Sequence, residues 1–268
     1  AYSAGLLQSA QEPFASAIIA RDAQTGKVQW TAPLTALKLA PQTVLVDGGK
    51  VFVTLGQPFG PTVQRSTSST VVAFDLATGK RLWTVQQPLA LMTATATALY
   101  ALETTTAGQG TNASTTPIQL LALDPASGTQ LWATPTFQYP GSVTPSSLPS
   151  GTVQLINNTV ITPAYNSQGN SIFNETSLVG YNATTGQQLW SLPGIGGEFV
   201  VGNDSVFTVT IALQGTLVPG QTPTAQNLGF KIEALDAATG AQQWSVPVTI
   251  SLSGESSFVY DYTTAPTS

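Results

Sequence analysis

Short apolar runs alternate with turn-forming residues along the whole chain. Runs such as 17–19, 71–72 and 120–121 last only a few residues, and each is soon followed by Asp and then by Gly. Short runs bounded by such residues are typical of β-strands joined by tight turns. The pattern therefore predicts an all-β protein made of many short strands.

An eleven-residue phrase repeats five times at the ends of such runs. Each copy begins with a small residue, has Asp or Asn at its third position and Thr or Ser at its sixth, and then has Gly at its seventh and Trp at its eleventh. All five tryptophans of the chain lie in these copies. The motif residues are Asp22, Gly26 and Trp30; Asp75, Gly79 and Trp83; Asp124, Gly128 and Trp132; Asn182, Gly186 and Trp190; and Asp236, Gly240 and Trp244.

The residue types in this phrase suit a β-hairpin. An Asp or Asn side chain can accept hydrogen bonds from backbone N–H groups two residues further on, and Gly adopts a positive φ without strain. The Trp then lies on the returning strand, where its large ring can cover a neighbouring sheet. Each phrase therefore predicts a hairpin that fastens one sheet to the next.

The segments between the phrases contain a second hairpin signal. Apolar residues flank Gly, Asn or Asp within 44–54, 153–161 and 199–209, and 93–102 lies at the same place in its segment. Together the two hairpins make a four-stranded antiparallel unit of about 50 residues, the size of a propeller blade. Polar connections at 56–70, 104–117, 166–176 and 212–229 join the hairpins, and we expect them on one face of the molecule, where long loops can carry recognition.

The two ends of the chain complete this count. The 19 residues before the first phrase and the 24 after the last together match one ordinary gap between phrases. Residues 257–261 have the position of a first strand, and 1–7 have the position of the second strand that would follow it. We therefore predict a single domain over 1–268, a five-bladed β-propeller with one blade composed of N- and C-terminal strands.

The phrase resembles the tryptophan-docking repeat of the pyrroloquinoline-quinone-type propellers, whose pattern is Ala-x-Asp-x-x-x-Gly-x-x-x-Trp. This resemblance covers nearly the whole chain and implies the propeller fold, but that family includes quinoprotein alcohol dehydrogenases as well as outer-membrane assembly scaffolds. The enzymes generally have eight blades, and many stack their cofactor on a vicinal disulfide. This chain has five repeats and no Cys, and no residues match their calcium site. We therefore expect no cofactor, no metal and no catalytic residues.

The composition narrows the candidate functions. Only 8% of the residues are charged, with a net charge of −5, while 39 Thr and 23 Ser supply polar surface. Without a Lys/Arg cluster, nucleic acid is not an expected partner. No apolar run is long enough to be a transmembrane segment. Because the chain contains no His and no Cys, imidazole and thiol chemistry are excluded.

Five Asn-x-Ser/Thr sequons favour an exported protein with N-linked glycans, as does Ala1 if a signal peptide has been removed. The candidate sites are Asn112, Asn157, Asn174, Asn182 and Asn203. Ordinary turn asparagines in a Thr-rich chain are the alternative interpretation. Asn182 also occupies the Asp position of the fourth phrase, so a turn role is expected there first.

Two weaker chemical interpretations stay open. Glu198, Asp47 and Asp261 fall at or near innermost strands, where carboxylates near one axis could bind a cation, although turn capping is the usual role of such Asp residues. Residues 194–197 are Gly-rich but lack the helix that a phosphate site requires, so we expect a loop. Tyr139, Phe173 and Phe59 are expected in loops, where they could stack on sugars or act as packing anchors.

These observations favour a non-catalytic function. The leading hypothesis is a secreted structural or interaction subunit of an extracellular or cell-surface assembly, such as a filament, sheath or surface layer. Its partners would be other copies or other surface proteins, with strand exchange between the chain ends as one route of assembly. A monomeric glycan- or protein-binding scaffold is the first alternative, and a divergent quinone-dependent oxidoreductase is the second.

Overall fold

The computed structural model describes eleven segments of the chain. They are residues 2–7, 15–34, 40–56, 69–104, 115–140, 151–166, 175–193, 195–213, 228–248, 250–251 and 259–260. Within these segments the protein consists of strands and turns, with no α-helix, as the sequence pattern predicts. Contacts divide the chain into two compact units, one of Ala1–Val153 with Thr184–Gly186 and the other of Gln154–Ala183 with Gln187–Ser268.

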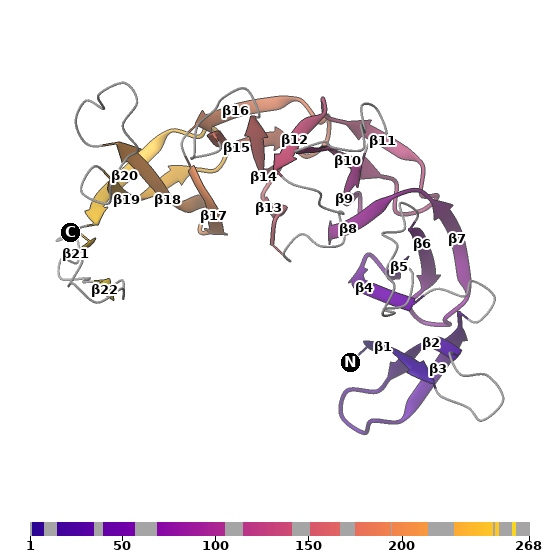
Figure 1. Ribbon diagram of the computed structural model, residues 1–268. Coiled ribbons are helices and arrows are strands. Elements are labelled where there is room, and N and C mark those ends of the chain that lie inside the picture. The colour runs from indigo at the N-terminus through magenta and orange to yellow at the C-terminus, as the bar shows by residue number, and fades with distance from the viewer. Residues whose placement is uncertain are drawn as a thin grey trace. The chain divides into compact units, whose positions relative to one another are not determined.

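The first unit contains three antiparallel sheets (Figure 1). The first sheet is β1 (Tyr2–Leu7), β2 (Ala15–Arg21) and β3 (Val28–Pro33). The second is β4 (Ala40–Asp47), β5 (Lys50–Gly56), β6 (Thr70–Asp75) and β7 (Arg81–Gln86). The third is β8 (Leu89–Ala94), β9 (Leu99–Thr104), β10 (Thr115–Leu123), β11 (Gln130–Ala133) and β12 (Phe137–Pro140).

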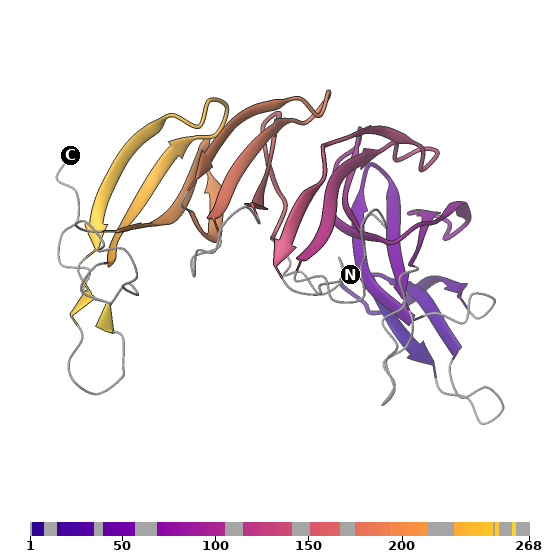
Figure 2. The same cartoon turned by 45° about the horizontal axis from the view of Figure 1, so that its top comes forward.

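The second unit contains two four-stranded sheets and a short hairpin (Figure 2). The fourth sheet is β13 (Gln154–Ile156), β14 (Thr159–Asn166), β15 (Glu175–Asn182) and β16 (Gln188–Pro193). The fifth is β17 (Ile195–Gly202), β18 (Ser205–Leu213), β19 (Leu228–Asp236) and β20 (Gln242–Val248). The strands β21 (Ile250–Ser251) and β22 (Val259–Tyr260) pair with each other. Sheets two, four and five have their strands in chain order, which confirms the predicted blade topology.

The third sheet follows the same plan with an interrupted outer strand. Both β11 and β12 pair with β10, at its two ends. Between them Pro135 has no N–H to donate, and Thr134 closes the gap because its N–H donates to the Leu120 carbonyl at 2.8 Å. In return, the Leu120 N–H donates to the Thr134 hydroxyl at 3.1 Å.

The predicted first hairpins form where the turn residues indicate. Gly48 and Gly49 have φ values of 52° and 73°, which suit a two-residue turn between β4 and β5. The corresponding turns in the second unit use Asn157, with φ 51°, and Asn203 and Asp204, with φ 50° and 63°. Asn and Asp are the side chains that best tolerate this region, so the local sequence specifies these turns.

The sheets bury both faces where another sheet lies on each side. In β5, Val51, Val53 and Leu55 pack towards the first sheet, while Phe52 packs towards the third. Side chains alternate between the two faces of a strand, so β5 is buried along nearly its whole length. Within each unit, the apolar core thus lies in layers between neighbouring sheets.

Two segments differ from or limit the sequence-based expectations. Residues Ile195 to Gly197, expected to be part of a loop, belong to β17, because Ile195 pairs with Thr210 of β18 and the strand continues through an irregularity to Phe199, which pairs with Thr208. At the N-terminus β1 pairs with β2, as predicted for residues 1–7. Of the C-terminal segment 257–261, the described strand β22 pairs with β21. A composite sheet of the two chain ends stays a prediction.

Candidate functional site

The turn of the first phrase is closed by the Asp22 carboxylate. Its Oδ1 accepts from the Gln24 N–H at 3.1 Å, and from the N–H and hydroxyl of Thr25, each at 2.7 Å. The Gly26 N–H donates to the Asp22 carbonyl at 2.9 Å, with Gly26 at φ 70°. Asp22 and Gly26 thus have the turn roles that their residue types indicate, and the Thr25 hydroxyl adds a further donor to the carboxylate.

The same turn recurs in the other Asp-containing phrases. A Thr or Ser hydroxyl donates to the Asp75, Asp124 or Asp236 carboxylate at 2.7 Å in each case. These hydroxyls, together with backbone N–H donors, hold the pKa of all four Asp residues below the usual range. In the fourth phrase the Asn182 N–H donates to the Gln187 carbonyl at 2.8 Å, which matches the Asp turns.

Each Trp lies across from the small residue that begins its own phrase. The pairs are Ala20 with Trp30, Ala73 with Trp83, Ala122 with Trp132, Gly180 with Trp190, and Ala234 with Trp244. A Cβ on Gly180 would come within 2.3 Å of the Trp190 ring. The first position of the phrase is therefore small because an indole covers it.

Each Trp also contacts the turn of the next phrase wherever a following sheet packs against it. The Trp30 Nε1–H donates to the Leu76 carbonyl at 2.9 Å, and the Trp30 ring lies against Gly79, where an added Cβ would come within 2.5 Å. Trp83 and Trp190 make equivalent bonds of 3.0 Å to Pro125 and Ala237.

The rings continue the same pattern. Trp83 lies against Gly128, Trp132 against Gly186 and Trp190 against Gly240. The turn glycine is therefore required both for its positive φ and for the space that it leaves to the ring of the preceding phrase.

Two halves of this contact have no counterpart among the described residues. Trp244, the last Trp, is 42% exposed, whereas Trp132 and Trp190 are 9% and 7% exposed. At the other end, a Cβ on Gly26 would meet no described atom within 4 Å. Ala23, which has the position of the carbonyl acceptors Leu76, Pro125 and Ala237, is exposed. Among the described residues, Trp244 therefore has no turn against its ring, and the turn of Asp22 to Gly26 has no Trp against it.

An apolar sheet face surrounds Trp244. Because residues paired across a sheet point to the same side, Val200, Phe207 and Trp244 share this face in one row, and Val209, Ile232 and Val246 share it in the next. Val200 is 61% exposed and Val209 is 41% exposed. We call these six residues the terminal face.

The second sheet has the same face in a buried form. There Leu45, Phe52, Val71, Trp83 and Val85 pack against the third sheet. Phe52 and Trp83 have ring centroids 6.0 Å apart, and Phe207 and Trp244 repeat this separation. The terminal face therefore has the same types of residue as an interior layer. Among the described residues, no sheet covers it.

Amide side chains join the inner strands of the fourth and fifth sheets. Gln154 donates through Nε2 to the Phe199 carbonyl at 2.9 Å and accepts from the Val201 N–H at 3.3 Å, so its amide pairs with β17 as a further backbone group would. In the adjoining turns, the Asn157 Nδ2 donates to the Asp204 carboxylate at 2.7 Å. These bonds fix the register between two successive blades.

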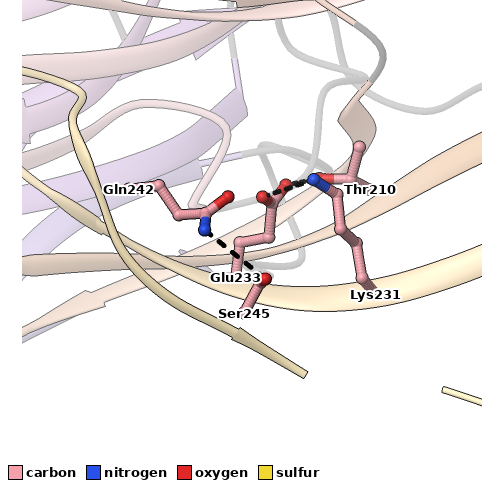
Figure 3. A network of polar contacts seen from close by, with 5 residues as sticks. All are labelled: Thr210, Lys231, Glu233, Gln242 and Ser245. Atoms are coloured by element: carbon pink, nitrogen blue, oxygen red, sulfur yellow. Dashed lines mark hydrogen bonds and ion pairs between the residues drawn. The ribbon is translucent and has the colours of Figure 1, made fainter. Parts of the chain in front are cut away.

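A buried carboxylate in the fifth sheet is not evident from the sequence pattern. Glu233 is 6% exposed, and it forms an ion pair of 2.7 Å with Lys231 and accepts a hydrogen bond from the Thr210 hydroxyl (Figure 3). Gln242 donates to Ser245 at 3.4 Å in the same region. The alternation of Lys231 and Glu233 on one face of β19 was the available signal. The network satisfies the Glu233 charge within the sheet, which is a structural role.

The acidic residues proposed for an axial site are only partly described. Asp47 ends β4, Glu198 lies within β17 without a described side chain, and Asp261 lies outside the described residues. In the described part of the chain no three His, Cys, Asp or Glu residues gather as metal ligands. Those segments therefore do not show the carboxylate cluster with which a family enzyme holds calcium beside its quinone.

The loop residues proposed for recognition lie largely beyond the described segments. Phe59 and Phe173 are outside them, as is most of each polar connection between the hairpins. Tyr139 is in strand β12 rather than in a loop, because residues 137–140 pair with the start of β10. No helix in the described segments is long and apolar enough to cross a membrane.

The sequons have different structural settings. Asn157 and Asn203 lie in turns at positive φ, and Asn203 is exposed. Asn182 ends β15 and is half-buried, while Asn112 and Asn174 lie outside the described residues. N-glycosylation stays a prediction at all five positions.

Successive four-stranded antiparallel sheets, fastened by a Trp that docks on the next turn, define a repeat protein of the β-propeller class. The profile of the family described as outer membrane protein assembly factor BamB matches residues 10–210 and 149–268, so the chain belongs to this family. This finding confirms the resemblance to the pyrroloquinoline-quinone-type propellers. No curated protein sequence matches the chain significantly.

Solved structures with a similar fold have low sequence identity to this chain. BamB from Moraxella catarrhalis is 17% identical, with a TM-score of 0.43, over 87% of this chain and 60% of that one. The quinohemoprotein alcohol dehydrogenase ADHIIG from Pseudomonas putida HK5 is 16% identical, with a TM-score of 0.48, over 92% and 40%. The β-propeller domain of the Trilobed protease from Pyrococcus furiosus is 8% identical, with a TM-score of 0.43, over 80% and 59%. The chain thus spans 40% to 60% of the length of these proteins.

Proposed function

We propose that the protein is a non-catalytic propeller subunit of an extracellular surface assembly, such as a filament, sheath or surface layer, and that it assembles through its terminal strands. The observation that carries this proposal is the open edge of the first sheet. Among the described residues, sheets two, four and five have four strands each, whereas β1 lies at the edge of a sheet of three. An edge strand offers its N–H and C=O groups to a further strand, and addition of that strand would complete the sheet.

The chain also contains a segment suited to fill that place. Residues 257–261 correspond to the first strand of a blade in the sequence, and their described part, Val259–Tyr260, is a strand already. If this segment of one copy completes the first sheet of another, each copy both gives and receives a strand. A contact between two different surfaces, repeated from copy to copy, produces a chain of subunits.

The composition supports a role outside the cell and between proteins. Only 8% of the residues are charged, so contacts between copies would depend little on salt or acidity. The matching family is described as the outer membrane protein assembly factor BamB, which favours a role in protein interaction, and the described residues contain no group of three His, Cys, Asp or Glu that could hold a metal ion. We therefore place self-association before recognition of a glycan or another protein.

Electron microscopy of the purified chain tests the proposal. We expect filaments or sheets in the full-length chain at high concentration, and soluble single subunits after deletion of residues 1–8. Deletion of residues 262–268 is the matched control, because it shortens the chain by a similar length without removing Val259 or Tyr260, and it should leave the assembly intact. Only monodisperse discs at every concentration would contradict self-assembly and favour the monomeric scaffold.

A further inference from the structure

The terminal face and the uncovered first turn are the two halves of one repeated contact. Inside the chain, the Trp of one phrase docks on the turn of the next, as Trp30 does on the turn of Asp75 to Gly79 and Trp190 on that of Asp236 to Gly240. These joints show what covers such a Trp: a backbone carbonyl for its N–H and a glycine beneath its ring. At the ends of the array Trp244 has the first half, and the turn of Asp22 to Gly26 has the second.

We propose that the terminal face of one copy docks on the first sheet of a second copy, with Trp244 against the second copy's Asp22–Gly26 turn. This inference rests on the proposed function. The Trp244 Nε1–H would donate to the Ala23 carbonyl, as Trp190 donates to Ala237. The surrounding apolar residues would lie against Ile19, which is half-buried and has the position of the buried Leu121. This inference identifies a specific side-chain contact beyond strand addition.

The residue Arg21 indicates that the terminal face is covered by the first sheet of a second copy rather than by the first sheet of the same chain. The second position of the phrase is Phe74, Leu123, Tyr181 or Leu235 in the other four copies, and all four side chains are buried. In the first phrase this position is Arg21, which is exposed and donates to the Gly26 carbonyl at 3.1 Å.

An Arg at this position suits a surface between two proteins better than it suits the interior of one protein. Arg is rarely buried in a protein interior but is enriched where proteins meet, and its guanidinium can stack on an indole. Arg21 lies beside the turn on which Trp244 of another copy would sit, and it would therefore add a cation–π contact there. The first sheet thus has the surface of a joint that forms between molecules.

The natural absence of Cys from the chain permits a direct test. In the internal joint between Trp83 and Gly128, a Cβ on Gly128 lies 2.9 Å from Val85 Cγ2, so the two β-carbons are at most about 4.4 Å apart, within the range of a disulfide. Val246 and Gly26 are the equivalent residues at the open ends. The variants V246C and G26C, each with a single Cys, are therefore mixed under mild oxidation.

We expect a disulfide-linked dimer of about twice the 27.8 kDa subunit mass in the mixture, and no such dimer with either variant alone. The double variant V246C/G26C should form a covalent ladder. If the double variant instead gives a monomer with an internal disulfide and the mixture gives no dimer, the chain closes on itself and the proposal is wrong. Absence of a disulfide in all samples would also overturn it.

A second measurement keeps the test valid if Cys at Gly26 impairs folding. Sedimentation of W244A should show an association constant lowered by at least about 30-fold, as for a central Trp of an interface. The matched control is L131A, which removes another exposed apolar side chain and should leave association unchanged. If the unsubstituted chain assembles and W244A assembles equally well, this joint is wrong while the proposed function stands. If the unsubstituted chain never assembles, the proposed function itself fails.

Discussion

At the scale of single residues, the phrase combines three requirements in one short hairpin. Asp22 and its equivalents satisfy backbone donors of the turn, the glycine four residues later takes a positive φ, and the small first residue makes room for the indole opposite. The residue just before each Trp is unpaired in a β-bulge, which leaves Leu82, Leu131 and Leu189 exposed. Each repeated feature of the phrase thus has a local physical cause.

The turn glycines provide a prediction with an internal control. Gly79→Ala should destabilise the protein by roughly 2–4 kcal/mol, because the new Cβ combines a left-handed backbone with a 2.5 Å approach to Trp30. Gly26→Ala should cost only about 1 kcal/mol in the dissociated chain, since it has the backbone strain without the clash. Urea unfolding measures both free energies. Equal losses would show that the Trp30 contact is not tight.

The turn carboxylates predict a loss of stability in acid. Their pKa values are lowered in the folded state, so their stabilisation is present above the unfolded pKa of about 3.9 and is lost as the pH falls through the folded values. Asp75→Asn should reduce this pH dependence, because an amide cannot titrate. Unfolding free energies at about pH 7 and about pH 2.5 measure the effect. If the difference in unfolding free energy between the two pH values is the same in D75N, the Asp75 carboxylate does not contribute to the pH dependence.

At the scale of strands and sheets, stability comes from layers that two neighbouring blades share. The layer between the second and third sheets contains Phe52, Leu91 and Leu121, and every one of these side chains is almost completely buried. A blade by itself would expose such faces to water. Successive blades therefore depend on each other, as is general for repeat proteins.

Two equivalent tryptophans should differ in their effect on stability. Trp190→Ala should cost about 3–5 kcal/mol, because its buried ring fills the layer between the fourth and fifth sheets. At concentrations where the chain is monomeric, Trp244→Ala should cost less than about half as much, since its ring is substantially exposed. Chemical denaturation of dilute protein compares the two. A similar loss in both variants would indicate that Trp244 is already covered in a single chain.

The ion pair in the fifth sheet predicts a coupled effect. Lys231→Met should destabilise the protein by about 2 kcal/mol, because it leaves the buried Glu233 carboxylate without its charge partner, although Lys231 itself is partly exposed. The double variant K231M/E233M should recover about half of that loss, because no buried charge remains. Double-mutant analysis of unfolding free energies measures the coupling. Additive losses would mean that the pair is not coupled.

The hairpins were predictable because their information is local. The turn residues, the small first residue and the Trp are all within one phrase, and they specify two strands in each copy without knowledge of their neighbours. Ile195 to Gly197 and Tyr139 were misplaced, because their strands depend on partners in β18 and β10 that a short segment cannot indicate. The terminal face was not predicted either. Its apolar residues are of the same types as those of the interior layers. Only the structure shows which sheet faces are covered by a neighbouring sheet.

At the scale of the whole molecule, five related repeats make a chain with two different ends. One end presents the apolar residues around Trp244, and the other presents the turn of Asp22 to Gly26. Among the described residues the two ends differ, because no Trp lies against Gly26 and the ring of Trp244 stays exposed. Function is therefore expected at the ends of the array as well as in the polar connections.

The low charge predicts that assembly is insensitive to salt. The association constant should change by less than about threefold between roughly 50 mM and 500 mM NaCl, because apolar contacts and backbone hydrogen bonds dominate the proposed joint, to which Arg21 brings a charge. Sedimentation across this range provides the measurement. A decrease of about tenfold or more would indicate an electrostatic interface elsewhere on the surface.

The pairing of a Trp with the turn of the next repeat has a directional consequence. If the same contact links copies, every growing fibre has one tip that displays indole and an opposite tip that displays an empty turn, so the fibre is polar along its length. Its two tips would elongate at different rates, and a single bound partner could halt growth at one tip while leaving the other free. A cell could thereby anchor such a fibre at one end and extend it from the other.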